Sequence, residues 1–243
     1  MSHSPSTRAP LVRASHLSAA HGLVDASFVV GPGLVTLVGP NGSGKTTLLR
    51  VLAGLLPHGG TLGVEGALAY MPQSFEFQSA MRVRDLVALG RAPHLGRLGR
   101  LSAADARAVA TALGRTGTTA LAARPVGTLS GGERARVALA RALASEAPIL
   151  LVDEPFAALD AAHALDISKR LRAEAERALV VAAIHDLALA RRIADRVLVM
   201  SGGRLVASGG PQLLDGEVLC DVFGIAPPPG GWQTPERVSK SPP

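Results

Sequence analysis

The chain is poor in several residue types, and each scarcity limits what it can be. Cys220 is its single cysteine, so it forms no internal disulfide or cysteine metal site, and we expect a small apolar role in a reducing compartment. Aromatic residues make up only 3% of the 243 residues, with Tyr70 and Trp232 the sole tyrosine and tryptophan. Without stacking platforms or a run of consecutive basic residues to carry the net charge of +6, we expect no nucleic-acid partner.

Long hydrophobic runs are also missing. The longest, residues 148–152 and 179–184, have the length of strands, whereas a membrane span needs about 20 apolar residues. The first ten residues lack the apolar stretch of a signal peptide. We therefore expect a cytoplasmic protein, which needs a spanning partner if it works at a membrane. The chain length suits one large α/β domain, or one domain with a small appended lobe, and the 47% hydrophobic content is ample for a core.

Short apolar runs alternate with longer amphipathic stretches. The runs at residues 34–38, 149–152 and 179–183 predict buried strands, and residues 196–200 and 204–207, joined by Ser-Gly-Gly, predict a hairpin. Strands without polar alternation, separated by helices, predict a mostly parallel sheet covered on both faces. Helices are expected at residues 46–55, 81–90, 102–113, 133–145, 161–178 and 187–194, with Ser102 as an N-cap.

These signals divide the chain into a domain and two tails. Residues 76–130 carry helix signals and no strand signal, so we expect a helical lobe inserted into the α/β core. Residues 1–10 and 227–243 are rich in Ser, Pro and Gly and are expected to be tails, which leaves one domain over residues 11–226.

A glycine-rich turn follows the strand predicted at residues 34–38. It fits the phosphate-binding pattern G-x-x-x-x-G-K-[ST], in which backbone N–H groups and the start of the next helix bind phosphates. Lys45 is expected to reach the β- and γ-phosphates, and Thr46 to ligate Mg²⁺. The alternative is an idle turn. The candidate nucleotide-binding residues are Gly39, Pro40, Asn41, Gly42, Ser43, Gly44, Lys45, Thr46 and Thr47.

An acidic pair ends the strand predicted at residues 149–152. If this strand lies beside the phosphate loop, Asp153 can hold Mg²⁺, usually through water, and Glu154 can polarise the attacking water. The alternative is two exposed carboxylates at a strand end.

The segment Leu-Ser-Gly-Gly-Glu at residues 129–133 gives a helix N-terminus suited to an anion, although alone it could be a linker or cap. Here the chain resembles the ABC ATPase family, whose signature is LSGGQ or LSGGE. The segment lies between the phosphate loop and the acidic strand, about twenty residues before Asp153, as the family requires. The resemblance implies that Ser130, Gly131, Gly132 and Glu133 cap the ATP held by the opposite subunit of a head-to-tail homodimer.

The resemblance assigns roles to four further residues. Gln73 resembles the glutamine that senses Mg²⁺ and water, which makes it a candidate metal ligand and a candidate catalytic residue with Glu154 and His185. Asp160 lies in the loop that crosses the dimer interface. His185 resembles the switch histidine that contacts the γ-phosphate. His21 stands where the family usually has an adenine-stacking aromatic, often Tyr, and an ordinary loop histidine is the alternative.

The resemblance also implies a fold. It is the P-loop NTPase ABC cassette, with a mostly parallel core sheet, a small antiparallel β lobe and an inserted helical subdomain. Residues 21–33 and 54–73 form shorter stretches than usual, so we expect a trimmed antiparallel lobe.

The resemblance further implies partners. A cassette without a fused membrane domain is typical of prokaryotic importers, so we expect integral permease subunits, an extracytoplasmic substrate-binding protein, and a location on the cytoplasmic face of the inner membrane. Residues 83–94 resemble the class that imports ferric siderophores, haem or cobalamin. A zinc or manganese importer, or a soluble cytoplasmic assembly complex, are the alternatives. The partner is expected to dock on the apolar face of residues 73–80.

Overall fold

The computed structural model describes residues 11–73, 79–95, 100–156, 159–215 and 221–224. Both predicted tails, Cys220, Trp232 and most of the docking segment at residues 73–80 lie outside these ranges, so the predictions made for them are not tested.

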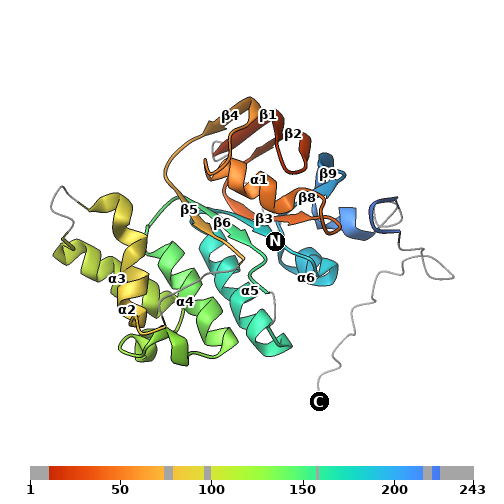
Figure 1. The fold of residues 1–243 in the computed structure, drawn as a ribbon. Coiled ribbons are helices and arrows are strands. Elements are labelled where there is room, and N and C mark those ends of the chain that lie inside the picture. The colour runs from red at the N-terminus through yellow and green to blue at the C-terminus, as the bar shows by residue number, and fades with distance from the viewer. Residues whose placement is uncertain (1–10, 74–78, 96–99, 157–158, 216–220, 225–243) are drawn as a thin grey trace, which may run out of the picture.

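One mixed sheet organises the described residues (Figure 1). The strand order is β4-β1-β2-β9-β8-β3-β7-β6-β5. Strands β8, β3, β7, β6 and β5 run parallel, whereas β1 pairs antiparallel with β2 and β4, and β9 antiparallel with β8. This confirms a mostly parallel core with an antiparallel lobe. The strands are β1 (Val12–Ala19), β2 (Leu23–Val30), β3 (Gly33–Val38), β4 (Gly59–Val64), β5 (Leu68–Met71), β6 (Ile149–Asp153), β7 (Leu179–Ala183), β8 (Arg196–Ser201) and β9 (Arg204–Gly209).

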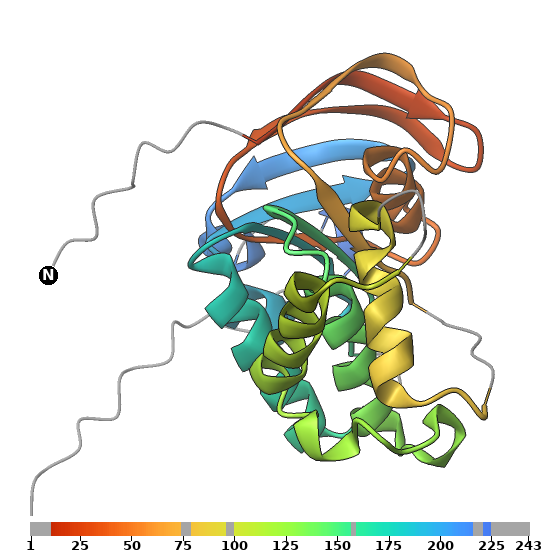
Figure 2. The ribbon, with the colours of Figure 1, turned by 90° about the vertical axis from the view of Figure 1, so that its left-hand side faces the viewer.

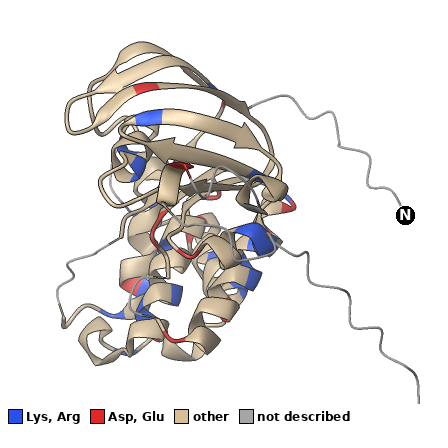
Figure 3. Cartoon of the chain, turned by 90° about the vertical axis from the view of Figure 1, so that its right-hand side faces the viewer, with Lys and Arg blue, Asp and Glu red and all other residues tan. Residues whose placement is uncertain are grey.

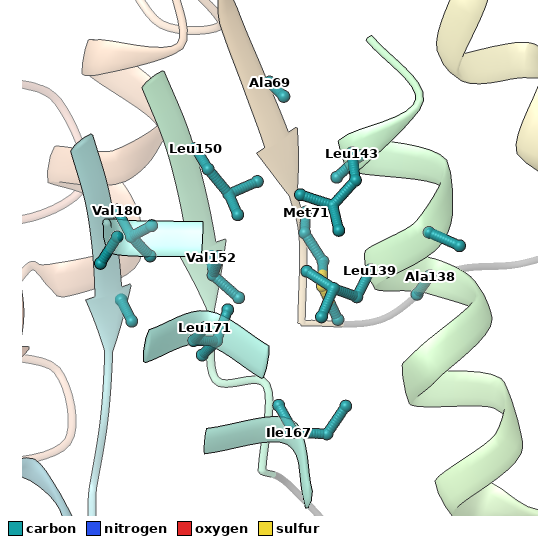
Figure 4. Close-up of a cluster of buried hydrophobic side chains, with 14 of the residues drawn as sticks. Ala69, Met71, Ala138, Leu139, Leu143, Leu150, Val152, Ile167, Leu171 and Val180 are labelled. Carbon is teal, nitrogen blue, oxygen red and sulfur yellow. The ribbon is translucent and has the colours of Figure 1, made fainter. Parts of the chain in front are cut away.

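The core strands are apolar at almost every position because both faces of the sheet are covered. In β6, Leu150 and Val152 belong to one hydrophobic cluster, and Ile149 and Leu151 to another, as the alternation of side chains along a strand requires. The first cluster packs against α4 (Gly131–Leu143), α5 (Ala161–Ala175) and α6 (Leu187–Ile193). Figure 4 shows the part of it that lies between the strands β5, β6 and β7 and the helices α4 and α5. The second packs against α1 (Lys45–Leu52) and the antiparallel lobe.

The predicted helical lobe lies beside α4, on the far side of the sheet from the antiparallel lobe (Figure 2). Within the described part of residues 76–130 there is no strand, only an isolated bridge between Arg82 and Pro125. Ser102 is the N-cap of α3, as predicted: its Oγ accepts from the backbone N–H of Asp105. The lobe contains α2 (Val83–Ala88), η1 (Leu89–His94), α3 (Ala103–Arg115), η2 (Thr119–Leu121) and η3 (Val126–Thr128).

The helix expected to stop at Gly90 instead continues as the 3₁₀ helix η1 to His94. A Cβ on Gly90 would lie 2.0 Å from the carbonyl oxygen of Arg141, so this glycine permits close packing on α4 and does not end a helix. Buried Arg91 donates to the carbonyl oxygen of Ala144 at 2.8 Å and caps the C-terminal end of α4.

Two other helices are shorter than predicted, and several strands were not predicted one by one. α1 ends at Leu52 because Gly54, at a φ of 69°, adopts the left-handed conformation that closes helices. α5 ends at Ala175, where the chain turns into β7. The strands β1, β2, β4 and β5 were missed. The pairing register of β1 shifts and its buried positions do not alternate regularly, and β4 is exposed at most positions, so neither of these two strands shows the plain alternation of a strand.

Charged residues are spread over the molecule. Figure 3 shows the described Lys and Arg residues on the antiparallel lobe and on the helices, with Asp and Glu among them. The net positive charge is thus not gathered on one element of the described chain.

Candidate active site

The parallel strands bring four separate segments to one edge of the sheet. β3, β5, β6 and β7 run parallel, so their carboxyl ends share that edge, and they are followed by Gly39, Gln73, Glu154 and His185. A cavity of about 400 Å³ opens there. It is lined by His21, Asn41, Gly42, Ser43, Gly44, Lys45, Thr46, Thr47, Gln73, Glu154 and His185.

The glycine-rich loop can close tightly because two of its positions, at which no side chain would fit, are occupied by glycine. A Cβ on Gly39 would lie 2.2 Å from the carbonyl oxygen of Met200, and a Cβ on Gly44 2.5 Å from that of Gly22. Both glycines also have positive φ values, 157° and 98°, which other residues rarely adopt. At these two glycines the loop therefore packs backbone against backbone, which holds it in its tight turn beside the cavity.

Lys45 places its ammonium group under this loop. Its Nζ donates to the carbonyl oxygens of Gly39 at 2.8 Å and Pro40 at 3.0 Å. Burial lowers the pKa of Lys45, while the nearby carboxylates of Glu154 and Asp153 act in the opposite direction. Within the described chain, the buried Ser43 hydroxyl has no hydrogen-bond partner. A cation, an unused hydroxyl and the N–H groups of a glycine loop fit a chain of phosphates.

The predicted metal-binding residues lie beside the loop. The Thr46 hydroxyl donates to Asp153 Oδ1 at 3.1 Å, and the Tyr70 hydroxyl donates to Asp153 Oδ2 at 3.2 Å. Burial raises the pKa of Asp153, and the hydrogen bonds from Thr46 and Tyr70 counteract that rise. Adjacent carboxylate and hydroxyl oxygens fit Mg²⁺, whereas Gln73, the third predicted ligand, is bonded to Glu154.

Tyr70 was not predicted as a site residue. Its place on β5, three residues before Gln73, is the only sequence signal that pointed to it.

Glu154 lies between Gln73 and His185 in the cavity. Its Oε2 accepts from Gln73 Nε2 at 2.5 Å, and its Oε1 pairs with His185 Nε2. Its φ of 47° is left-handed, a conformation that costs energy for a residue other than glycine and is concentrated at functional sites. The structure thus brings together the three residues predicted to be catalytic, from three different strand ends.

His21 is among the residues that line the cavity. Its backbone carbonyl accepts a hydrogen bond from the Thr47 hydroxyl at 2.8 Å, which fixes the His21 turn against the start of α1. Stacking of its imidazole on an adenine remains a prediction.

The signature residues do not line this cavity. Ser130 is the N-cap of α4: its Oγ accepts from the N–H of Glu133, whose carboxylate accepts from the N–H of Ser130 at 2.9 Å. These bonds to Ser130 lower the pKa of Glu133. Gly131 and Gly132 form the first turn of α4, and Asp160 is the N-cap of α5. One chain therefore has a cavity with a phosphate loop and, outside it, a second helix N-terminus suited to an anion.

Known proteins match this arrangement in sequence. The family model described as ABC transporter matches residues 23–157. A cobalamin import ATP-binding protein of Halobacterium salinarum is 45% identical over 74% of this chain and 48% of its own length, so the chain spans about half of that relative. Hemin import ATP-binding proteins of Streptomyces coelicolor and Burkholderia pseudomallei are 46% and 41% identical, over 74% and 88% of this chain and 69% and 93% of theirs.

Solved structures match the fold. A metal-chelate type ABC transporter in an inward-facing conformation gives a TM-score of 0.83 at 28% identity, covering 89% of this chain and 90% of that one. An ATP-binding cassette in its ADP conformation gives 0.78 at 21% identity, over 89% and 99% of the two chains. Among the described helices, none has the length and hydrophobicity to cross a membrane. The matched family region contains the phosphate loop, Gln73, the signature and the acidic pair, and the chain belongs to the ATP-binding domains of the ABC transporter family, which hydrolyse ATP.

Proposed function

We propose that this chain is the ATP-hydrolysing subunit of an ABC importer. The observation that carries the proposal is the convergence of the phosphate loop, Gln73, Glu154 and His185 on one cavity beside Asp153. Each of these groups comes from a different strand end. Together they supply what phosphoryl transfer to water requires: hydrogen-bond donors to the phosphates, oxygen ligands for Mg²⁺ and a carboxylate base.

The residues divide the work by their positions. Lys45 and the loop N–H groups bind the phosphates, and Thr46 and Asp153, joined by Gln73, would hold Mg²⁺, which neutralises phosphate charge when bound. Glu154 orients the attacking water and accepts its proton. Gln73 and His185 hold the Glu154 carboxylate in place, and His185 also faces the γ-phosphate.

A second copy of the chain completes the site in this proposal. Ser130, Gly131, Gly132 and Glu133 form a helix N-terminus suited to an anion but lie outside the cavity of their own chain. A head-to-tail homodimer places them over the ATP bound by the opposite copy, with Asp160 near the interface. Two ATP molecules then bind between two chains.

The importer assignment and its cargo rest on similar proteins. The cobalamin and hemin import relatives and the metal-chelate neighbour support uptake of a metal chelate: ferric siderophore, haem or cobalamin. The proposed partners are integral permease subunits and, through them, an extracytoplasmic binding protein, with the cassette on the cytoplasmic face of the membrane.

Glu154→Gln tests the activity. The amide cannot accept the proton of water, so steady-state ATP turnover should fall by at least about a hundredfold. ATP binding should survive, and MgATP should shift this variant to a dimer in gel filtration. Glu176→Gln, which alters an exposed carboxylate at the end of α5, is the matched control and should behave like the parent chain. Undiminished turnover by Glu154→Gln would show that this carboxylate is not the base.

A pull-down from solubilised membranes of the native host tests the partners. A polytopic membrane protein, recovered with a binding protein, is the expected result. A soluble partner without any membrane protein would contradict the importer assignment.

A further inference from the structure

The imidazole of His163 lies directly against the signature glycine Gly132. A Cβ built on Gly132 would fall 2.0 Å from His163 Cδ2 and 2.6 Å from His163 Nε2. Gly132 is helical and buried, and its φ is not positive, so the backbone conformation does not require glycine there. Gly131 differs, because a Cβ on it would meet nothing within 4 Å. Of the two signature glycines, only Gly132 is needed for a contact within its own chain.

Asp160 fixes the orientation of this imidazole. Its Oδ1 accepts from the backbone N–H of His163 at 2.8 Å and pairs with His163 Nδ1 at 2.8 Å. These two bonds lower the pKa of Asp160. Since an ionised carboxylate can only accept, Nδ1 carries the proton in this pair, and the rest of the ring is turned toward Gly132. The bond from the backbone N–H of His163 to Asp160 is sufficient to cap α5. The second bond, from the imidazole ring to Asp160, is therefore not required for the helix cap.

Asp160 belongs to the segment that also carries Glu154. It follows Glu154 by six residues, and between them Phe156 packs against the hydrophobic core and accepts a hydrogen bond from the N–H of Leu159 at 3.2 Å. A path of covalent and non-covalent contacts therefore runs from Glu154 through Asp160 and His163 to Gly132.

We propose that His163 is a positioning residue that couples the catalytic segment of a chain to its own signature. The inference rests on the proposed head-to-tail dimer. In that dimer Glu154 serves the ATP of its own chain, while Gly132 serves the ATP of the opposite chain. His163 then transmits a displacement of one ATP site to the other, so that the two sites bind and hydrolyse ATP cooperatively.

Three substitutions separate the two interactions of His163 in the full chain. His163→Ala removes both, His163→Asn keeps a donor for Asp160 but no ring, and His163→Phe keeps a ring but no donor. In the Glu154→Gln background, each variant is measured for its ATP affinity and for its ATP-dependent dimer dissociation constant. In the chain that retains Glu154, each is measured for the Hill coefficient of ATP turnover. For all three variants we expect the ATP affinity of the monomer to be unchanged, dimerisation to weaken at least about fivefold, and the Hill coefficient to fall toward one.

The asparagine variant distinguishes a loss of coupling from a loss of folding. Because His163 has 42% of its side chain exposed and Asn preserves the bond to Asp160, this variant is expected to fold like the parent chain. A merely structural role in capping α5 would be rescued by Asn, with normal dimerisation and cooperativity, and this would overturn the inference.

A second experiment tests the contact with Gly132 directly. Gly132→Ala should weaken ATP-driven dimerisation, and His163→Ala, which makes room for the new methyl group, should then cause a smaller further loss than it causes in the unaltered chain. Gly131→Ala, whose site is open within the chain, should gain nothing from His163→Ala. Equal effects of His163→Ala on both glycine variants would overturn this inference and leave the proposed function standing. Failure of the unaltered chain to bind ATP or of Glu154→Gln to dimerise would overturn the proposed function and, with it, this inference.

Discussion

Tyr70 provides the sharpest test of how the fold supports the metal-binding residues. Its hydroxyl donates to Asp153 Oδ2 at 3.2 Å, opposite the oxygen that accepts from Thr46. Burial, together with Asp153, raises the pKa of Tyr70 to about 12, so the hydroxyl stays protonated and remains a donor at neutral pH. Tyr70→Phe removes this donor and keeps the ring, so the Asp153 carboxylate loses one of the two bonds that orient it.

The magnitude follows from the bond. A hydrogen bond to a charged group contributes about 1.5–3 kcal/mol, and the length of this one favours the lower end of that range. A loss of about 1.4 kcal/mol is a factor of about ten in an equilibrium constant. Loss of a partner that orients a metal ligand typically costs about 10–100-fold in metal affinity. We therefore expect the Mg²⁺ concentration for half-maximal ATP turnover to rise about tenfold in Tyr70→Phe.

The assay is ATP turnover as a function of free Mg²⁺ at saturating ATP. Thr36→Val is the matched control: it removes a buried hydroxyl on β3, a strand that β7 and β6 separate from β5, and the described chain offers this hydroxyl no hydrogen-bond partner. The control should leave the Mg²⁺ dependence unchanged, while maximal turnover at high Mg²⁺ should largely recover in Tyr70→Phe. An unshifted Mg²⁺ midpoint in Tyr70→Phe would refute the claim that Tyr70 orients a metal ligand.

Two further predictions concern stability. Hydrogen bonds from Ser102, with the guanidinium of Arg91, lower the pKa of Asp105 to about 2 from 3.8, so its stabilising contribution is complete above pH 3.8 and lost as the pH falls toward 2. Asp105→Asn should flatten the pH dependence of the urea midpoint in that window, and an unaltered slope would contradict this assignment. Leu171→Ala, in the cluster of Figure 4, should cost about 2–5 kcal/mol in the free energy of unfolding, as fully buried leucines do. Val206→Ala, at a side chain 49% exposed, is its control, and equal losses in the two variants would show that burial is not the cause.

The sequence was most informative where a structure is made by neighbouring residues. The phosphate loop needs only a strand, a glycine turn and a helix in succession, so spacing alone located Lys45 and Thr46. Ser102 and Ser130 cap helices through bonds to residues three positions later, a pattern readable in the sequence. The core strands were found because burial on both faces makes their residues apolar without interruption.

The antiparallel strands were harder to recognise. β4 contains three glycines and is exposed at most positions, and the pairing of β1 is interrupted by register shifts. Such strands are defined by the partners to which they bond, and the hydrophobic pattern on which the prediction relied is weak in them. The lobe was therefore expected from family resemblance, while its strands became visible only in the structure.

By itself the sequence determined which chemical groups the chain has and which short segments present them: the glycine loop with Lys45, the acidic strand end and the signature turn. Only the tertiary structure decided which of these groups meet. Tyr70 reaches Asp153 across 83 positions because β5 and β6 are parallel neighbours. His163 reaches Gly132 because α4 and α5 pack on the same face of the sheet. Contacts of this kind depend on strand order and helix packing, which arise from the burial of the whole core, and no local pattern of residues encodes them.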